Sequence, residues 1–135
     1  MMLKSIAALG LFVLSCFALP AFAHHSFPVH FVPEEMVTVT GVVKEFHFTN
    51  PHGVVYFTVT DKDGKETEWR AETNSPNLLK RRGWSKDSLV AGQKITVEGW
   101  PARDRSPLLR IATITLPDGS VLTGQQSRAP TTAED

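Results

Sequence analysis

The order of short alternating segments constrains this chain more than any other feature of its sequence. Apolar and polar residues alternate in five segments, near residues 37–48, 55–59, 67–72, 95–98 and 109–116. A period of two is typical of half-buried β-strands. Turn-forming residues separate the segments, as at residues 49–53 and 61–65. The sequence therefore predicts a mainly β fold.

A single short helix is predicted between the third and fourth strands. Ser75 suits its N-cap, Pro76 its first position, and Gly83 the left-handed position that follows the C-cap. Trp84 would then pack back on Leu79. Three strands, a short helix and two strands follow one another in the OB-fold, a small five-stranded Greek-key barrel. We predict an OB-fold-like barrel, with an open five-stranded sheet capped by the helix as the alternative.

The first predicted strand changes phase along its length. Val37 and Val39 share one face, whereas beyond Gly41 the apolar set becomes Val42 and Phe46. A change of phase at a glycine indicates a bulge or a bend. A bent first strand favours a barrel, because a bent strand can form part of both sides of the barrel.

Residues 1–23 have the features of a secretory signal peptide. A basic start precedes an apolar run, and Ala21-Phe22-Ala23 places small residues at both positions that a signal peptidase recognises. The segment is too short and wrongly flanked for a membrane span. The alternative is a lipoprotein acylated at Cys16, which is disfavoured because the apolar run continues past it. We expect a periplasmic or secreted protein.

The processed chain divides into three parts. Residues 24–36 form an N-terminal arm, residues 37–124 the barrel domain, and residues 125–135 a polar tail that we expect to be disordered. Without residues 1–23 the processed chain has 112 residues and no cysteine, so a disulfide or a thiolate site is excluded.

Charge and motif content argue against two classes of function. The full chain has 14 basic and 14 acidic side chains, so it has no net field to attract a polyanion. Binding to nucleic acid is therefore not expected. The sequence also lacks a glycine-rich phosphate loop, a serine in an elbow motif and, once processed, a cysteine nucleophile. We expect a protein that is not an enzyme.

Six short motifs together resemble one protein family. They are His24-His25-Ser26-Phe27, Thr49-Asn50-Pro51-His52, Ser75-Pro76-Asn77, Arg81-Arg82-Gly83-Trp84, Asp87-Ser88-Leu89 and Leu116-Pro117-Asp118-Gly119. In combination they resemble a family of small exported bacterial proteins that is classed as a domain of unknown function. The resemblance implies export and a small β-barrel, and it implies no activity.

Every histidine lies in the first 52 residues, at positions 24, 25, 30, 47 and 52. Neutral imidazole is a ligand for copper, zinc and nickel. Cleavage behind Ala23 would give His24 a free α-amine beside its own imidazole, and cleavage one residue earlier would make His25 the third residue. Either terminus offers nitrogen ligands in a geometry that Cu(II) favours. We predict a copper site of His24, His25 and His52, with adventitious binding to a frayed terminus as the alternative.

The turn between the first two strands is the second candidate feature. His47 and His52 frame it, and in an OB-fold this turn borders the usual binding face. We expect His47 to share a face with Val43 and Glu45. A metal-free interaction module, which binds a peptide, a glycan, a small molecule or a partner protein, is the alternative function. Its candidate binding residues are Asn50, Pro51, His47 and an outward-facing Trp100, with Tyr56 also outward.

Overall fold

The computed structural model describes residues 27–125, which form a β-barrel with two short helices. In chain order the elements are α1 (Phe27–His30), β1 (Val37–His47), β2 (Val54–Thr60), β3 (Glu66–Glu72), α2 (Pro76–Arg81), β4 (Lys94–Pro101), β5 (Leu108–Thr115) and β6 (Val121–Thr123). All five predicted strands and the predicted helix are present. The single turn of α1 was not predicted from the sequence.

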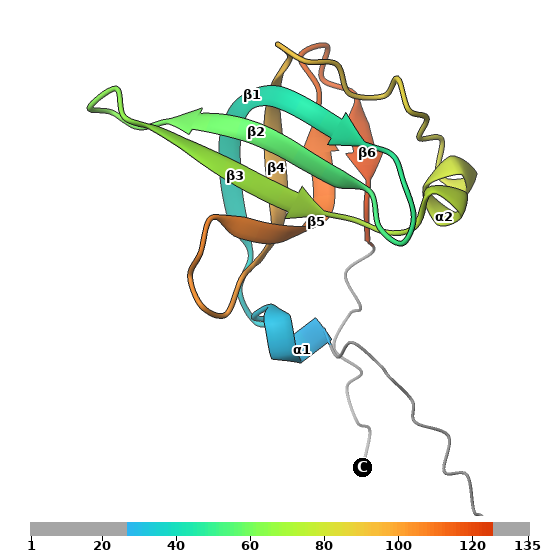
Figure 1. Cartoon of the computed structure of the whole chain (residues 1–135), viewed down its shortest axis with the longest axis horizontal. Coiled ribbons are helices and arrows are strands. Elements are labelled where there is room, and N and C mark those ends of the chain that lie inside the picture. Colours follow the sequence, from blue (N-terminus) through green and yellow to red (C-terminus); the bar gives the residue numbers. More distant parts are fainter. Residues whose placement is uncertain (1–26, 126–135) are drawn as a thin grey trace, which may run out of the picture.

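The strands close into a barrel through one parallel pairing. The sheet order is β3-β2-β1-β4-β5-β6, and β3 also pairs with β5 (Figure 1). In that closing pair Arg70 lies opposite Leu108, and Glu72 lies opposite Arg110. β1 pairs with β4 through its first half and with β2 through its second half. The predicted five-stranded OB-fold-like barrel is confirmed, and the open sheet is wrong.

The phase of β1 changes at Lys44 rather than at Gly41. The register with β2 shifts across Lys44, which is the extra residue of a β-bulge. Val43 is therefore buried at 2% exposure, whereas Val42, expected inside, is 43% exposed. Gly41 has another role: a Cβ there would lie 2.5 Å from the carbonyl oxygen of Thr58, so the strands cross too closely for a side chain.

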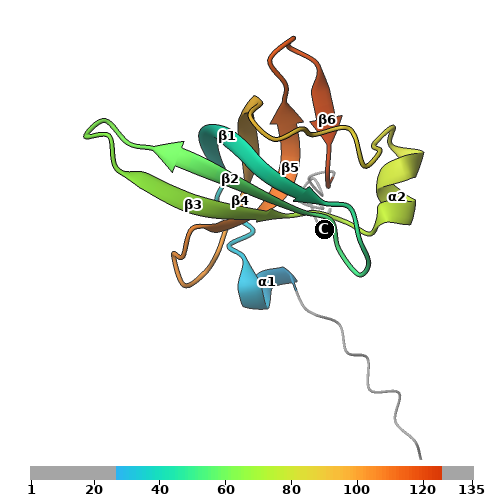
Figure 2. The same cartoon turned by 45° about the horizontal axis from the view of Figure 1, so that its top comes forward.

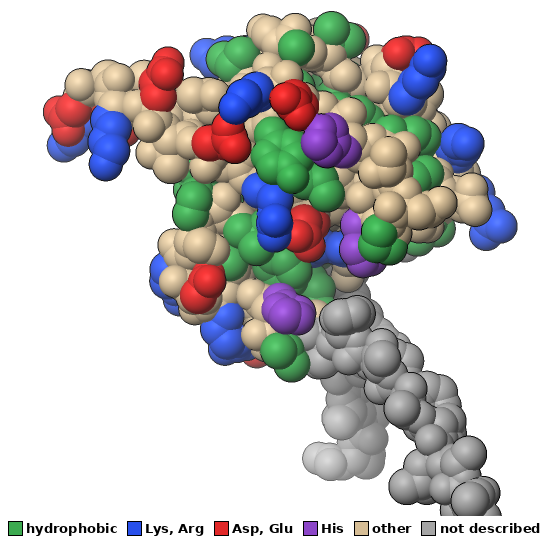
Figure 3. Space-filling model, viewed as in Figure 1, with side chains coloured by type: hydrophobic (Ala, Val, Ile, Leu, Met, Phe, Trp, Pro, Cys, Tyr) green, Lys and Arg blue, Asp and Glu red, His purple; other side chains and the backbone are tan. Residues whose placement is uncertain are grey.

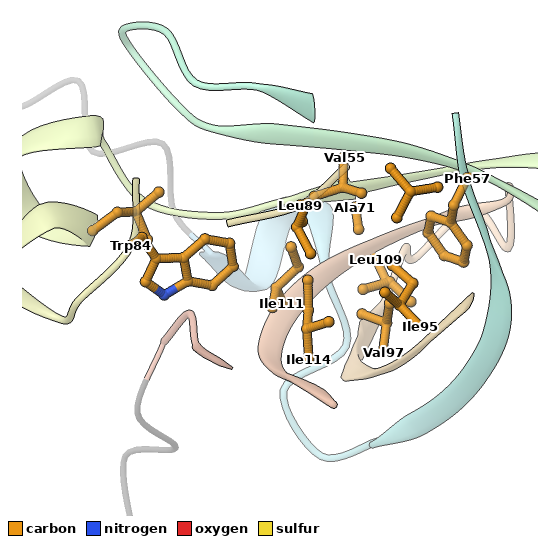
Figure 4. Close-up of a cluster of buried hydrophobic side chains, with 12 residues drawn as sticks. Val55, Phe57, Ala71, Trp84, Leu89, Ile95, Val97, Leu109, Ile111 and Ile114 are labelled. Atoms are coloured by element: carbon orange, nitrogen blue, oxygen red, sulfur yellow. The ribbon is translucent and has the colours of Figure 1, made fainter. Parts of the chain in front are cut away.

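Side chains from every strand of the barrel fill its interior (Figure 4). The strands contribute apolar side chains, and the segment from α2 to β4 adds three more. These residues are Val43, Val55, Phe57, Ala71, Leu79, Trp84, Leu89, Ile95, Val97, Leu109, Ile111 and Ile114. Burial of this apolar surface is the main favourable term in the stability of the barrel.

α2 ends in the predicted glycine motif. Gly83 has a φ of 84°, and its N–H donates to the Lys80 carbonyl oxygen at 3.1 Å. The Trp84 N–H donates to the Leu79 carbonyl oxygen at 3.1 Å, which completes a Schellman motif. Ser75 occupies the N-cap, but its side chain makes no capping hydrogen bond. The motif turns Trp84 back into the core beside Leu79, as predicted.

The N-terminal arm packs on the outside of the barrel. Phe31 and Trp100 are buried there with Ala112, and Phe27 and Leu108 pack against them. Trp100 lies outside the barrel interior, as expected, but the arm covers it, so it is buried and not on the exposed surface that was predicted. α1 and α2 lie on different sides of the barrel (Figure 2). Neither of the two described helices has the length and apolar character needed to cross a membrane.

Candidate functional site

A cleft of about 570 Å³ opens between the arm and the barrel. Residues from α1, the β1–β2 turn, β3, β5 and the end of the described chain line it: Phe27, His30, Phe31, Pro51, His52, Arg70, Glu72, Leu108, Arg110 and Gln125. Its position between the β1–β2 turn and β3 matches the face on which OB-folds bind their ligands. A shallower hollow beside Tyr56 and Ser106 shares Arg70 and Leu108 with it.

Backbone and side-chain hydrogen bonds attach the arm to the rest of the fold. The Val32 N–H donates to the Pro101 carbonyl oxygen at 3.0 Å. The backbone N–H of Arg103 donates to the His30 carbonyl oxygen at 2.9 Å, and its Nε–H donates to that of Pro28 at 2.9 Å. The C-terminal end of α1 is thus bonded to the loop after β4, which holds Phe27 and Phe31 as one wall of the cleft.

An exposed ion pair adds a second attachment for the arm. Arg105 donates from both terminal nitrogens to Glu35, at 2.6 and 2.7 Å. The hydrogen bond from Arg105 lowers the pKa of Glu35. In the same loop, hydrogen bonds from the Ser106 hydroxyl and N–H lower the pKa of Asp104. The conformation of this loop therefore depends on two ionised carboxylates.

The β1–β2 turn forms the opposite wall of the cleft. Pro51 and His52 line it, and the next residue, Gly53, is bonded into the fold. The Gly53 N–H donates to the Asn74 carbonyl oxygen at 2.9 Å, and the Thr73 N–H donates to the Gly53 carbonyl oxygen at 2.9 Å. Because these bonds join the turn to the segment between β3 and α2, the core supports the position of His52.

The parallel pair of β3 and β5 forms the floor of the cleft. Ala71 and Leu109 point into the barrel, so their neighbours Arg70, Glu72 and Arg110 point out. An ion pair of 2.9 Å joins Arg70 Nη2 to Glu72 Oε1. In Figure 3 basic, acidic and histidine side chains lie close together on the face between the barrel and α1.

Neutral amides hold Arg110 in place. Its Nη2–H donates to Asn74 Oδ1 at 2.7 Å, and its Nε–H donates to Gln125 Oε1 at 3.1 Å. The Asn74 amide in turn donates to the carbonyl oxygen of Gly124 at 2.8 Å. Burial lowers the pKa of Arg110, and the charge of Glu72 partly offsets that shift. The result is a fixed, half-buried guanidinium at the cleft.

The structure brings together only part of the predicted site. His52 and Pro51 line the cleft, whereas Asn50 is exposed in the same turn and does not line it. His47 lies outside the cleft, where its Nε2 is 2.8 Å from Glu45 Oε2 and its ring centroid is 5.1 Å from that of Tyr56.

His47 shares its face with Glu45 as expected, but Val43 points into the core because the bulge at Lys44 reverses the alternation. His24 and His25 lie outside the described residues, as do the predicted signal peptide and the polar tail beyond Gln125. Their roles stay predictions.

The sequence reasoning missed most of the cleft. None of its charged residues Arg70, Glu72 and Arg110 was among the predicted site residues. Gln125 was predicted to belong to the disordered tail, but its backbone N–H donates to the Ile111 carbonyl oxygen at 3.1 Å. The alternation of β5 signals an outward Arg110, but only the pairing with β3 shows which charges it joins.

The described residues do not form a metal site by themselves. Within residues 27–125 no three histidine, cysteine, aspartate or glutamate side chains are grouped closely enough to hold a metal ion. His30 and His52 are the imidazole-bearing residues of the cleft.

Residues 11–108 match the model of a family described as a family of unknown function, DUF6152. The chain belongs to this family. The DUF6152 match confirms the predicted resemblance to a family of unknown function, and it covers five of the six motifs but not Leu116-Pro117-Asp118-Gly119. It takes in the cleft residues from Phe27 to Leu108 and ends before Arg110 and Gln125. A comparison with curated proteins finds no match.

Proposed function

We propose that this chain is a non-catalytic exported binding protein, and that it binds copper at the cleft between the arm and the barrel. His24, His25 and His52 are the proposed ligands. One observation carries the proposal: Phe27 and His52 line the same cleft. The described part of the arm therefore begins at the cleft that the histidine of the β1–β2 turn also lines.

The number of residues between them and Phe27 would allow the two N-terminal histidines to reach this cleft. His25 precedes Phe27 by two residues, so their Cα atoms are at most about 7 Å apart at 3.3–3.6 Å per residue. His24 is one residue further. With His52 they would supply three imidazoles, and a processed terminus at His24 would add its α-amine. A set of nitrogen ligands suits the tetragonal coordination of Cu(II).

A Cu(II) titration of the chain that begins at His24 tests this proposal. We expect His52→Ala to weaken binding measured by calorimetry against a competing chelator. The matched control is His47→Ala, since His47 lies outside the cleft and should leave the affinity unchanged. Adding one residue before His24 should also weaken binding, because it moves the α-amine away from that imidazole.

Two results would overturn the copper proposal. The first is an affinity no tighter than that of the denatured chain. The second is an unchanged affinity in His52→Ala, which would confine copper to the terminus and exclude the barrel from the site.

The cleft also supports a second candidate, a metal-free interaction module. Two arginines and an apolar wall are unusual surroundings for a dication but suitable ones for an organic ligand or a peptide. The exposed turn residues Asn50 and Pro51 remain available to a peptide, glycan or protein partner, whereas Trp100 is buried. Ligand binding in the presence of a chelator would favour this candidate.

A further inference from the structure

The charged groups of the cleft leave a positive charge that its own residues do not cancel. Arg70, Glu72 and Arg110 are the charged residues of its lining, apart from histidine. Glu72 pairs with Arg70 Nη2 at 2.9 Å. Two guanidinium groups and one carboxylate leave one positive charge when the histidines are neutral.

Arg110 and Arg70 share this charge, because Glu72 pairs with Arg70 and also lies opposite Arg110. The two hydrogen-bonded partners of Arg110, Asn74 and Gln125, are neutral amides. They fix the plane of the guanidinium without neutralising it. Burial lowers the pKa of Arg110, which shows that its charge is only partly solvated. A partly desolvated, pre-oriented guanidinium binds an anion more strongly than a mobile surface arginine does.

Apolar surface adjoins the two guanidinium groups. Phe27 and Phe31 come from the arm, Leu108 from β5 and Pro51 from the turn. The ring of Phe27 is fixed by contacts with Phe31 and Trp100, whose ring centroids lie 5.4 and 5.3 Å away. The cleft volume of about 570 Å³ lies within the usual range for small-molecule sites.

We propose that the cleft binds a monocarboxylate with an apolar body. The carboxylate pairs with Arg110 and Arg70, and the apolar part packs against Phe27 and Leu108. One negative charge matches the one uncancelled positive charge of the lining. A doubly charged phosphate would meet the carboxylate of Glu72, so the same lining disfavours it. This site uses guanidinium groups rather than imidazole and does not depend on the proposed copper site.

Phenylacetate is the probe for this proposal, measured by calorimetry with a chelator present to remove copper. Phenylacetamide is its neutral analogue and phenyl phosphate its dianionic one. We expect phenylacetate to bind at least about ten-fold more tightly than phenylacetamide, because charged hydrogen bonds to a guanidinium exceed neutral ones by that margin or more. Arg110→Gln should abolish the difference.

Two further variants keep the test decisive. Arg70→Gln alters a half-exposed side chain, so it should fold and reduce the preference for phenylacetate. Arg81→Gln removes an exposed charge on α2 and should leave the preference intact. Equal binding of phenylacetate and phenylacetamide, tighter binding of phenyl phosphate, or an unchanged preference in Arg70→Gln and Arg110→Gln would each overturn the proposal. Because the titration excludes copper, each of these results leaves the copper proposal standing.

Discussion

The two short helices of this protein are attached to the barrel in different ways. α2 sends Leu79 into the main core, and its terminal motif returns Trp84 to the same core. α1 buries none of its own four residues and lies outside the barrel, where Phe31 anchors the segment that follows it. α2 is therefore part of the barrel, whereas the arm is a strap laid across it.

The cleft lies between the strap and the β1–β2 turn, which packs on α2. One wall of the cleft contains His52, which precedes Gly53 in the β1–β2 turn. A Cβ on Gly53 would lie 3.1 Å from Leu79 Cδ1, so this turn packs closely on α2. The other wall contains Phe27, which depends on the strap. The two walls of the cleft are therefore held by different sets of contacts, one from α2 and the other from the strap.

Leu79→Ala should have the largest effect on stability, because it removes the side chain that joins α2 to the core. Leu79 is fully buried, so we expect a loss of about 2–5 kcal/mol in the free energy of unfolding, measured by urea denaturation. The control is Val90→Ala, at a position 54% exposed, which should change stability by less than about 0.5 kcal/mol. Similar effects of the two variants would contradict the assigned role of α2.

Gly83→Val should be the next most costly change. No atom lies within 4 Å of a Cβ built there, so the cost comes from the φ of 84° and not from a clash. A left-handed conformation in a residue with a Cβ costs about 1–2 kcal/mol, which thermal unfolding would detect. Gly83→Asn is the matched variant and should lose less, because asparagine tolerates this conformation. Equal losses in both variants would argue against this explanation.

Phe27→Ala should loosen the strap and leave the barrel folded. It removes ring contacts with Phe31 and Trp100, which are worth about 1 kcal/mol. Hydrogen exchange should accelerate at the amides of Val32 and Arg103, which bond the strap to the barrel, more than at amides of the core strands. Val29→Ala, at a position 63% exposed, is the control. Uniform acceleration across the barrel would mean that strap and barrel unfold as one unit.

Acid should have the smallest effect on the strap, and it should act through Glu35. The pKa of Glu35 is lowered by its hydrogen bond from Arg105, below an ordinary value of 4.5. The stabilisation from this pair is thus complete above about pH 4.5 and is lost as the pH falls through the lowered pKa. Exchange at the Val32 amide should accelerate in that range. In Glu35→Gln the acceleration should be weaker, and an identical acid profile would contradict this assignment.

The sequence predicted local features well because local chemistry determines them. Gly83 and Trp84 were assigned correctly, since a helix end needs a residue with positive φ and a following apolar contact. The bend in β1 was predicted but misplaced. A bulge at Lys44 and one at Gly41 give the same change in the later apolar positions, and only the pairing with β2 distinguishes them.

Features that depend on distant segments could not be predicted. Alternation put Trp100 on the outer face of β4, but it does not show that Phe31, about 70 residues earlier, covers it. Similarly, Arg110 faces outward by alternation, while its position beside Glu72 depends on the parallel pairing of β3 with β5. The cleft is a product of such contacts, which explains why only His52 and Pro51 line it among the candidate residues within 27–125.

The central claim is that the cleft between strap and barrel is the ligand site, and Cu(II)-induced broadening of amide NMR signals tests it most directly. The chain that begins at His24 would be titrated with less than one equivalent of Cu(II). We predict loss of signal at cleft residues, such as Phe27, His52 and Leu108, and intact signals at the distant turns that contain Gly64 and Gly119. Broadening confined to residues before Phe27, with His52 and Leu108 unaffected, would contradict the claim.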